Sequence, residues 1–394
     1  MTETRPEIDP PWGGSLRPAS LPLASDIEAQ LAALKGRRVA VALSGGVDSA
    51  VAALLLARAG ASPIGLALRL HDPEPDNPLA PRACCTPDDL QDARRVAEAL
   101  GIPFYVLDAR EAFNGEVVQP FVDAYLAGKT PNPCVGCNSF VKLDRLDARA
   151  RALGCVALAT GHYARLAHDP SGAPHLYAGA DVEKDQSYFL FGVESGILSR
   201  LVFPLGAMTK PQVREMALAS GLPVAHKLDS QEVCFVGGAG AGDFVRRRAE
   251  AQGDHRGKIL DPEGRVLGEH DGVMGYTVGQ RKGLGVSAAH PLHVLSIDAE
   301  DKSITVGAAE LLMRRGLRAS KAAWPAGVPN GPIVAEARIR YRGRPSRATI
   351  TPLAGDRVEV HFDQPMRAIA PGQAVVFSDG PEILGGAFID EALA

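Results

Sequence analysis

Between about residue 37 and residue 220 the chain alternates short apolar stretches with amphipathic ones, and this rhythm restricts the fold more than any other feature. The apolar stretches have the length of buried strands and lie at residues 39–43, 64–70, 104–107 and 155–159. Two amphipathic stretches, residues 50–59 and 88–100, show the helical spacing of apolar side chains, and a glycine follows each. Strands that alternate with helices predict a parallel sheet with helices on both faces, so we expect an α/β, Rossmann-like domain.

The character of the sequence changes after about residue 227, where clustered glycines and turn-rich segments replace the helical pattern. Farther on, turn residues separate short alternating strands at even spacing: residues 294–297, 304–306, 333–339, 357–362 and 374–377. This spacing predicts a small antiparallel β-barrel at the C-terminal end. The predicted organisation has four parts: a disordered lead-in (residues 1–30), the α/β domain (31–226), a small central domain (227–291) and the barrel domain (292–394).

A chain of 394 residues, 46% of them hydrophobic, can bury more than one core, which agrees with several domains. The formal net charge is −4, so a surface for nucleic acid has to come from local clusters of lysine and arginine. No apolar run approaches the roughly 18 residues of a membrane-spanning helix, and the first residues lack an apolar signal core. We expect a soluble, cytoplasmic protein with no membrane partner, and a monomer by default.

A glycine-rich loop, Ser44-Gly45-Gly46-Val47-Asp48-Ser49, joins the first predicted strand to the first predicted helix. Its two glycines allow a sharp bend close to a phosphate, and the following helix offers N–H groups and the positive end of its dipole. Asp48 is a poor direct phosphate contact, but it can hold Mg²⁺ or orient the loop. The alternative is an ordinary strand-to-helix turn, in which Gly-Gly and Ser-Gly are common. The loop lacks the lysine of a Walker motif, so it is not the usual kinase or GTPase loop.

The chain contains six cysteines: Cys84, Cys85, Cys134, Cys137, Cys155 and Cys234. In a reducing compartment, exposed cysteines are better interpreted as reactive or metal-binding than as disulfide-bonded. Cys155 lies in an apolar run and is expected to be a small core residue. Cys134 and Cys137 form a Cys-x-x-Cys pair behind two prolines, on a turn or first helical turn that would expose them and lower the pKa of a thiol.

Three interpretations of this cysteine pair remain open. The first is that the cysteines are incidental or buried. The second is a sulfur relay, in which one cysteine carries a persulfide and another assists or resolves it. The third is an iron–sulfur cluster held by Cys134, Cys137 and Cys234, with one iron left open. A zinc site would need a second pair of ligands, whereas only Cys234 follows. The spacing alone does not separate the relay from the cluster.

Further motifs follow in order along the chain. They are Thr130-Pro131-Asn132-Pro133, Thr160-Gly161-His162-Tyr163, Lys184-Asp185-Gln186-Ser187-Tyr188 and Gly275-Tyr276-Thr277-Val278-Gly279-Gln280-Arg281-Lys282-Gly283. With the glycine-rich loop and the cysteines, they make the chain, from about residue 38 to residue 390, resemble the bacterial tRNA-specific 2-thiouridylases of the PP-loop ATP pyrophosphatase superfamily. The resemblance implies ATP-dependent 2-thiolation of the wobble uridine in tRNA, expected for the lysine, glutamate and glutamine tRNAs.

The resemblance also implies roles for single residues. ATP, with Mg²⁺, would lie on the glycine-rich loop and two residues beyond it: Ala42, Leu43, Ser44, Gly45, Gly46, Val47, Asp48, Ser49, Leu68 and Gly161. The uridine C2 oxygen would attack the α-phosphate; persulfide sulfur on Cys234 would then displace AMP, with Cys137 as the nucleophile. The tRNA and its target base would meet Asn132, Pro133, Cys134, His162, Lys184, Asp185, Gln186, Arg340, Tyr341 and Gln373. His162 would orient the tRNA or the loop and would not be a general base. The sulfur would come from a cysteine desulfurase or a sulfur-relay protein.

The chain departs from the family pattern at Cys134, where many members carry aspartate. A third cysteine near the reacting base keeps a [4Fe-4S] cluster open as an alternative. It also leaves open which of Cys134 and Cys137 is essential, although the Cys-Asn step favours Cys137.

An arginine-rich stretch supports an RNA surface independently of the resemblance. The arginines at every second position are Arg338, Arg340, Arg342 and Arg344. On a strand they would share one face, which suits phosphate contacts, and Tyr341 could stack on a base. A charged edge strand that avoids aggregation would show the same pattern. The run at residues 246–248 is expected to be a solvated helix face that adds only non-specific attraction.

Two other functions agree with parts of the sequence. Another PP-loop synthetase, which adenylates a small carboxylate or amide, would have no use for Cys137 and Cys234. A nucleotide-binding regulatory or RNA-binding module would have no turnover. AMP formation that depends on tRNA excludes the regulatory module, whereas AMP formation driven by a small metabolite favours the synthetase.

Overall fold

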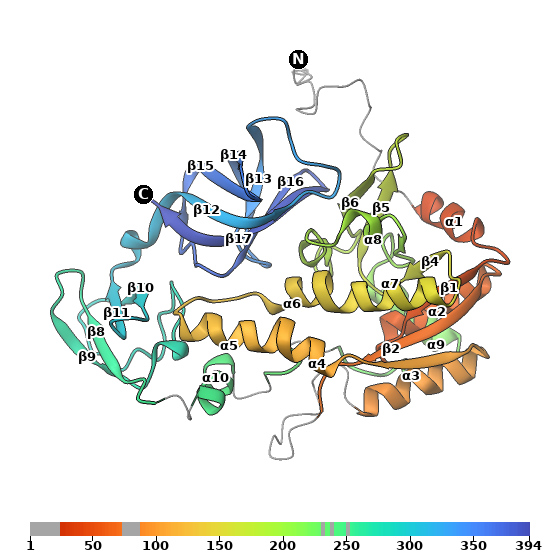
Figure 1. The fold of residues 1–394 in the computed structure, drawn as a ribbon, viewed down its shortest axis with the longest axis horizontal. Coiled ribbons are helices and arrows are strands. Elements are labelled where there is room, and N and C mark those ends of the chain that lie inside the picture. The colour runs from red at the N-terminus through yellow and green to blue at the C-terminus, as the bar shows by residue number, and fades with distance from the viewer. Residues whose placement is uncertain (1–23, 73–86, 230–232, 237–239, 250–252) are drawn as a thin grey trace.

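The computed structural model describes residues 24–72, 87–229, 233–236, 240–249 and 253–394. Residues 1–23 of the predicted lead-in lie outside these ranges, and so do Cys84 and Cys85. Residues 24–30 are not part of a disordered lead-in, because α1 (Ala24–Ala32) is a helix that buries Ile27 and Leu31. Figure 1 shows a sheet surrounded by helices at one end of the molecule, a small sheet at the opposite end, and a barrel above both.

The first region contains a five-stranded sheet of order β3-β2-β1-β4-β7, in which every neighbouring pair is parallel. Its strands are β1 (Arg38–Ala42), β2 (Ser62–Arg69), β3 (Phe104–Asp108), β4 (Ala157–Ala159) and β7 (Leu201–Val202). The predicted parallel sheet is therefore confirmed. Because β2 and β4 lie on opposite sides of β1, the strand order reverses at β1, and the carboxyl ends of β1 and β4 form the switch point at which sheets of this kind bind ligands.

Helices cover both faces of this sheet. One face carries α1, α2 (Val47–Arg58), α3 (Pro87–Leu100) and α9 (Lys210–Ala219). The other face carries α4 (Arg110–Phe113), α5 (Gln119–Leu126) and α7 (Leu143–Ala152). Val39 and Val41 of β1 pack against the helices on the first of these faces, and Ala40 packs against those on the other. Because the strand is buried on both faces, its sequence is a continuous apolar run. In the described ranges, no helix is long and apolar enough to cross a membrane.

The second region is a four-stranded sheet of order β10-β11-β8-β9. Helix α10 (Ala241–Ala249) precedes its strands, which are β8 (Gly257–Leu260), β9 (Val266–His270), β10 (His293–Asp298) and β11 (Ser303–Gly307). The expectation that residues 294–297 and 304–306 belong to the barrel is wrong, because β10 and β11 pair with each other and β11 pairs with β8. The alternating pattern of a half-buried strand does not indicate which sheet receives it.

The third region is the predicted antiparallel barrel, which is confirmed. Its strands are β12 (Met313–Ala323), β13 (Ile333–Arg338), β14 (Ser346–Leu353), β15 (Arg357–Arg367), β16 (Ala374–Asp379) and β17 (Glu382–Leu393). They pair in the order β12-β15-β14-β13-β16-β17, and β12 closes the barrel on β17. The same β17 pairs with β6 (Pro174–Ala178) of the hairpin that β6 forms with β5 (Ala164–His168). The barrel sheet therefore continues into the first region.

The arginine-bearing strand predicted at residues 338–344 is wrong. The strand β13 ends at Arg338, and the chain then turns, so the arginines that follow do not share a strand face. Gly343 and Pro345 explain the difference, because glycine weakens a strand and proline removes a ladder donor. A Cβ on Gly343 would lie only 2.8 Å from Arg340 Cγ, which shows how tight the turn is.

Candidate active site

The loop between β1 and α2 has the geometry of an open anion site. Gly45 has a φ of +73°, and a Cβ there would overlap the carbonyl oxygen of Asp89, so only glycine fits. Gly46 is the N-cap of α2, and no side chain caps that helix end. Ser49 Oγ instead donates to Gly46 O at 3.0 Å and accepts the Ser44 N–H at 3.2 Å. Among the described residues, no side chain is seen to cap the first-turn N–H groups of α2, and a phosphate is the ligand that such groups suit.

The segment that follows β4 closes on this loop. A Cβ on Gly161 would lie 2.7 Å from Ser49 N and 2.8 Å from the carbonyl carbon of Asp48, so the two backbones touch. The structure therefore brings Gly161 next to the glycine-rich loop, at the switch point between β1 and β4. Leu68 lies near the end of β2, and its side chain is buried in the core.

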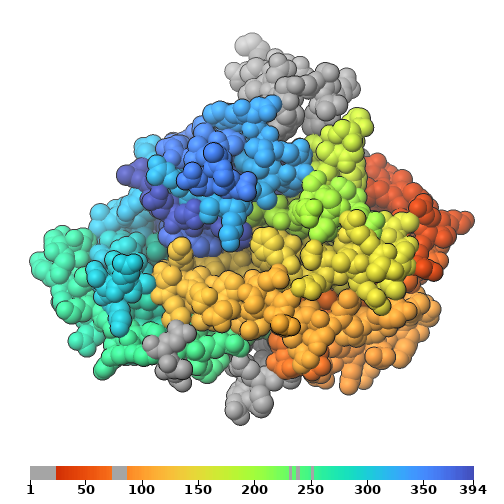
Figure 2. Space-filling view, viewed as in Figure 1, coloured from red at the N-terminus to blue at the C-terminus, as the bar shows by residue number. Residues whose placement is uncertain are grey.

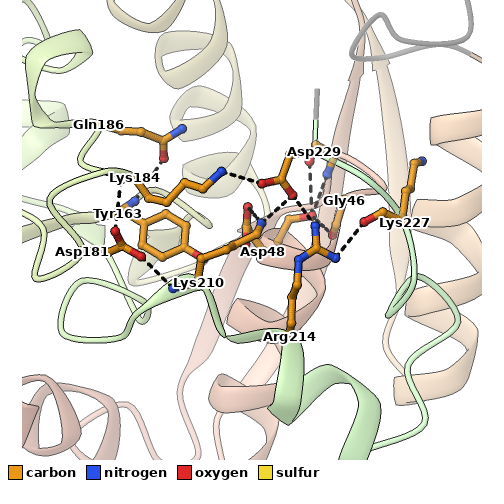
Figure 3. Close-up of polar contacts among 12 residues, drawn as sticks. Gly46, Asp48, Tyr163, Asp181, Lys184, Gln186, Lys210, Arg214, Lys227 and Asp229 are labelled. Atoms are coloured by element: carbon orange, nitrogen blue, oxygen red, sulfur yellow. Dashed lines mark hydrogen bonds and ion pairs between the residues drawn. The ribbon is translucent and has the colours of Figure 1, made fainter. Parts of the chain in front are cut away.

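Asp48 lies in a cluster of charged side chains (Figure 3). Lys210, the first residue of α9, contacts both Asp48 carboxylate oxygens through its ammonium group, at 2.7 and 2.8 Å. Tyr163 donates its hydroxyl to Asp48 Oδ1 at 2.8 Å, and burial, together with the Asp48 charge, raises the pKa of Tyr163. The Asp48 carboxylate is thus already held by the ammonium group of Lys210 and the hydroxyl group of Tyr163, so it is suited to orienting the loop. The geometry favours this role of Asp48 over the holding of Mg²⁺.

A second carboxylate, that of Asp229, binds the same ammonium group. It contacts Lys210 Nζ at 2.8 Å, Lys184 Nζ at 2.7 Å and Arg214 Nη2 at 2.7 Å (Figure 3). Partial burial works to raise the pKa of Asp229, but the hydrogen bonds and charges of Lys184 and Lys210 outweigh it and lower the pKa to about 2. Lys184, a predicted tRNA contact, is thus connected to the nucleotide loop through Asp229 and Lys210.

The two cysteines predicted to do the chemistry pack into one hydrophobic cluster. Cys137 is 4% exposed, and the partly buried Cys234 packs against the same cluster. Cys134, in the short helix α6 (Pro133–Gly136), is exposed, so the expectation that both members of the pair are exposed is wrong for Cys137. Cys155 is buried, and burial raises the pKa of its thiol, as expected for a core residue.

The three cysteines proposed for an iron–sulfur cluster do not form a ligand set. Within the part of the chain that the structure describes, no three His, Cys, Asp or Glu side chains are grouped so that they could hold a metal ion. Cys134, Cys137 and Cys234 are all described, so their arrangement does not fit a cluster bound by three thiolates.

The barrel supports the proline-framed loop ahead of Cys134. Thr130 donates its N–H to Pro371 O at 2.8 Å, and its carbonyl accepts a hydrogen bond from Gln373 Nε2 at 2.9 Å. Gln373 therefore fixes the backbone of the loop. The half-buried residues that follow in this loop are Asn132 and Pro133.

Two predicted tRNA contacts use their side chains within the protein. Asp185 is 7% exposed and accepts hydrogen bonds from Ser187 N at 3.1 Å and Ser187 Oγ at 3.0 Å. Gln186 accepts the Tyr163 N–H at 3.1 Å through Oε1. The side chains of Asp185 and Gln186 thus shape the surface next to Lys184.

Tyr341 and Arg340 lie in the turn after β13 and connect it to other segments. Tyr341 donates its hydroxyl to Asp185 O at 2.8 Å, and its ring lies 4.5 Å from that of Phe189. Arg340 donates to Arg367 O at 2.8 Å. The half-buried Tyr341 ring is therefore already packed on one side, and the turn is held in a defined position.

The surroundings of His162 favour its neutral form. Burial and the nearby charge of Lys142 lower the pKa of His162 to about 4. Its Nδ1 lies 2.8 Å from Thr160 Oγ1, and its ring meets that of Phe203 edge-on. A neutral imidazole with fixed neighbours agrees with an orienting role.

Comparison with known proteins identifies the family. A tRNA-specific 2-thiouridylase MnmA from Geobacter metallireducens is 47% identical over 364 residues, which cover 91% of this chain and 98% of that protein. The chain belongs to the tRNA-specific 2-thiouridylase family. A protein of the same name from Moorella thermoacetica is 46% identical over 354 residues, which cover 89% of this chain and 98% of that protein.

Domain families match three successive parts of this 2-thiouridylase chain. They are described as a tRNA methyl transferase HUP domain (residues 37–238), a tRNA methyl transferase PRC-barrel domain (242–308) and an aminomethyltransferase beta-barrel domain (314–389). The three matches correspond to the parallel sheet, the central sheet and the barrel.

Likeness to solved structures is much lower. NMN synthetase from Francisella tularensis has 18% identity and a TM-score of 0.30, over 52% of this chain and 74% of that one. A 4-thiouridine synthetase in complex with RNA and ATP has 16% identity and a TM-score of 0.33, over 51% of this chain and 45% of that one. Likeness at this level carries no argument about function.

Four residues of the charged cluster have no role in the sequence interpretation: Tyr163, Lys210, Arg214 and Asp229. Lys210 and Asp48 are 162 positions apart in the chain, so no local motif joins them. One signal was present, because Lys210 occupies the first turn of a helix, where the helix dipole disfavours a cation that lacks a partner or ligand.

Proposed function

We propose that this protein is a tRNA-uridine 2-sulfurtransferase, which uses ATP to activate the wobble uridine and replaces its C2 oxygen with sulfur. The observation that carries the proposal is the 47% identity, over 91% of the chain, to a tRNA-specific 2-thiouridylase. The uncapped N-terminus of α2 and the ammonium group of Lys210 beside Asp48 supply what the phosphates of ATP need.

ATP would lie with its phosphates on residues 42–49, while Leu68 and Gly161 would border adenine and ribose. Mg²⁺ would enter with the nucleotide, because it prefers phosphate oxygens and water to a cage of protein ligands. The uridine C2 oxygen attacks the α-phosphate and pyrophosphate leaves; the adenylated oxygen can then depart as AMP, a far better leaving group. Lys210 would stabilise the charge that develops on the phosphates.

The target uridine has to leave the stacked anticodon loop before it can react. Asn132, Pro133 and Cys134 would border the pocket that receives it. The support of this loop by Gln373 gives the pocket a fixed wall. Lys184 and Arg340 would contact the tRNA nearby, with the substrates expected among the lysine, glutamate and glutamine tRNAs.

We assign the persulfide to Cys234 and the second thiol to Cys137. Cys234 is the more exposed of the two, so a cysteine desulfurase or a sulfur-relay protein can load it, whereas Cys137 is 4% exposed. The terminal persulfide sulfur attacks C2 and AMP leaves. The Cys137 thiolate then attacks the inner sulfur, the S–S bond breaks, and the C2 thiocarbonyl remains on the RNA. A Cys137–Cys234 disulfide forms, which a thiol reductant has to reduce before the next turnover.

The test is 2-thiouridine formation, measured by mass spectrometry of nucleosides. Iron-free protein is mixed with unmodified tRNA, Mg-ATP and a persulfide donor. We expect product, and a loss of at least about 100-fold in Cys137→Ala and Cys234→Ala, because each removes a sulfur that the transfer needs. Release of pyrophosphate that depends on tRNA should persist in both variants, because adenylation precedes the attack by sulfur.

The control is Cys155→Ala, which removes a thiol from the core and should keep most of the activity. Product that appears only after anaerobic rebuilding of an iron–sulfur cluster would contradict the persulfide relay. AMP formation driven by a small metabolite without RNA would contradict the proposed function itself and favour a synthetase.

A further inference from the structure

The proposed reaction leaves one sequence motif without a role: residues 275–283, which we name the central loop. The loop precedes β10, and its two cations, Arg281 and Lys282, are exposed. Three other exposed arginines of the central region are paired: Arg256 with Asp254 at 2.8 Å, Arg265 with Asp261 at 2.6 Å and Arg246 with Asp243 at 3.1 Å. Arg281 and Lys282 have no carboxylate oxygen within 4.0 Å among the described residues. Both cations of the central loop are therefore available for an anion.

Internal hydrogen bonds hold the central loop in one shape. Gln280 Oε1 accepts the Thr277 N–H at 3.0 Å, and Gln280 Nε2 donates to Lys282 O at 3.0 Å. Val294 of β10 donates its N–H to Gln280 O at 2.9 Å, which fastens the loop to the central sheet. The two cations are thus presented by a preorganised backbone, so little conformational entropy is lost when a ligand binds them.

The central loop packs against Ala368 of the barrel, the neighbour of a third exposed cation. Gly279 has a φ of +89°, and a Cβ on it would lie 2.7 Å from Ala368 Cβ, so the loop and the end of β15 are in close contact. Arg367 precedes Ala368 and is exposed, and it also lacks a carboxylate partner in the described part of the chain. The close approach at Gly279 brings the cations of two regions to one place on the surface. Figure 2 shows the central region and the barrel as neighbours there.

A buried histidine lies beneath these charges. His293 is 7% exposed, and its Nδ1 has no hydrogen-bond partner among the described residues. Burial lowers the pKa of His293, and the charges of Arg367 and Arg281 lower it further, against the opposing charge of Glu310. Both guanidinium groups therefore act on one imidazole. Like charges held together without a counter-ion favour the binding of an anion.

The same place is joined to the predicted tRNA surface. Arg340, a predicted tRNA contact, donates through Nη2 to Arg367 O at 2.8 Å and to Ala368 O at 3.4 Å. The cations of the central loop are thus separated from Arg340 by one short segment of the barrel. A polyanion that lies on Arg340 can continue onto Arg367 and Arg281.

We propose that Arg281, Lys282 and Arg367 form a binding site for backbone phosphates of the tRNA. The proposal rests on the proposed function, because it takes tRNA as the substrate. Guanidinium and ammonium groups on a fixed loop match phosphate oxygens. The site therefore adds affinity and fixes the orientation of the RNA without selecting its sequence. It gives the tRNA a second contact besides the target-base pocket.

The test removes two charges and measures how tRNA binding depends on salt. Arg281→Gln combined with Lys282→Gln should lower the slope of log affinity against log salt by about two, one for each lost phosphate contact. The KM for tRNA should rise roughly tenfold, since charge-assisted hydrogen bonds are lost, while kcat and the KM for ATP stay unchanged. Melting temperature is measured in parallel to verify that the variant is folded.

The matched control is Arg246→Gln combined with Arg247→Gln, on α10 of the same region, which should lower the salt slope much less, because this helix face is expected to add only non-specific attraction. An unchanged slope in the Arg281 and Lys282 variant, or an equal decrease in the control, would overturn the proposal. These outcomes test the site only if the wild-type protein binds tRNA and forms 2-thiouridine. If the wild type does neither, the proposed function fails, and that result is separate from the failure of this site.

Discussion

The nucleotide loop and the central loop hold their cations in opposite ways. Lys210 has a carboxylate on each side, Asp48 and Asp229, and its side chain is only 8% exposed. Arg281 is exposed and has no carboxylate partner within the described residues. A paired, nearly buried cation is fixed in position, whereas an exposed, unpaired cation is available for an incoming anion.

The difference indicates two uses of positive charge in one protein. A fixed ammonium group beside the phosphate loop can stabilise charge that develops during the reaction, and salt screens it little because water is largely excluded. Exposed cations attract a polyanion from a distance, and salt weakens them strongly. Once tRNA and ATP are bound, the rate of adenylation of the uridine should therefore be insensitive to salt. The affinity for tRNA, by contrast, should be sensitive to salt.

Replacement of Lys210 tests the fixed charge and should have the largest effect. Lys210→Met is expected to lower tRNA-dependent AMP formation at least about 100-fold, because it removes a preorganised charge next to the loop proposed to hold the phosphates. It also leaves Asp48 and Asp229 facing each other without the cation between them. Release of AMP and pyrophosphate under saturating tRNA is the measurement.

The control for this variant is Lys258→Met, which removes an exposed lysine in β8 of the central sheet. It should leave AMP formation within about twofold of the wild type, as expected for a surface substitution. If Lys210→Met also retained its activity while the protein stayed folded, the paired cation would have no part in the chemistry, and the contrast between the two loops would lose its meaning.

Local patterns were sufficient to predict the first half of the site. The strand that ends at Ala42 and the glycines of the loop occupy neighbouring positions, so their periodicity and turn chemistry can be read directly. The parallel sheet follows from the strand and helix alternation in the same way. Gly161 was predicted through the family resemblance, and its close contact with Ser49 gives that prediction a physical reason.

Features that depend on distant pairing could not be read from the sequence. Lys210 meets Asp48 across 162 positions, and nothing next to either residue indicates the other. The strands β10 and β11 have the alternation of barrel strands, but their partner is β8. The error at residues 338–344 has a different cause, because Gly343 and Pro345 are visible breakers that the arginine spacing outweighed.

Substitution of Gly161 tests how tightly the nucleotide loop packs against the segment after β4, with a smaller expected effect. In Gly161→Ala the new Cβ would lie 2.7 Å from Ser49 N, so the loop has to move away from the segment after β4. We expect the KM for ATP to rise roughly tenfold, with less change in the salt dependence of tRNA binding, because the central loop is not touched. The control is Gly115→Ala in the helical segment before α5, where a Cβ meets nothing within 4 Å. An equal rise in that control, or no rise in Gly161→Ala, would contradict the tight packing.

The smallest effect is expected where the barrel joins the first region, at the pairing of β6 with β17. His175 of β6 is buried, and its Nδ1 lies 2.6 Å from Glu382 Oε1 of β17. The hydrogen bond to Glu382 raises the pKa of His175 above its ordinary 6.5, against the effect of burial. Because the pKa is higher in the folded than in the unfolded protein, the stabilisation is fully present below about pH 6.5 and is lost as the pH rises through the folded value.

The melting temperature measured at a series of pH values tests this junction. As the pH rises from about 6.5 through the folded pKa, the wild type should lose stability that His175→Gln does not lose, since a neutral amide keeps a hydrogen bond but does not titrate. His168→Gln, at an exposed histidine of the same hairpin, should follow the wild type. Parallel curves for the wild type and His175→Gln would show that the His175–Glu382 pair contributes no pH-dependent stability. The barrel would then be held on the first region by strand pairing and packing alone.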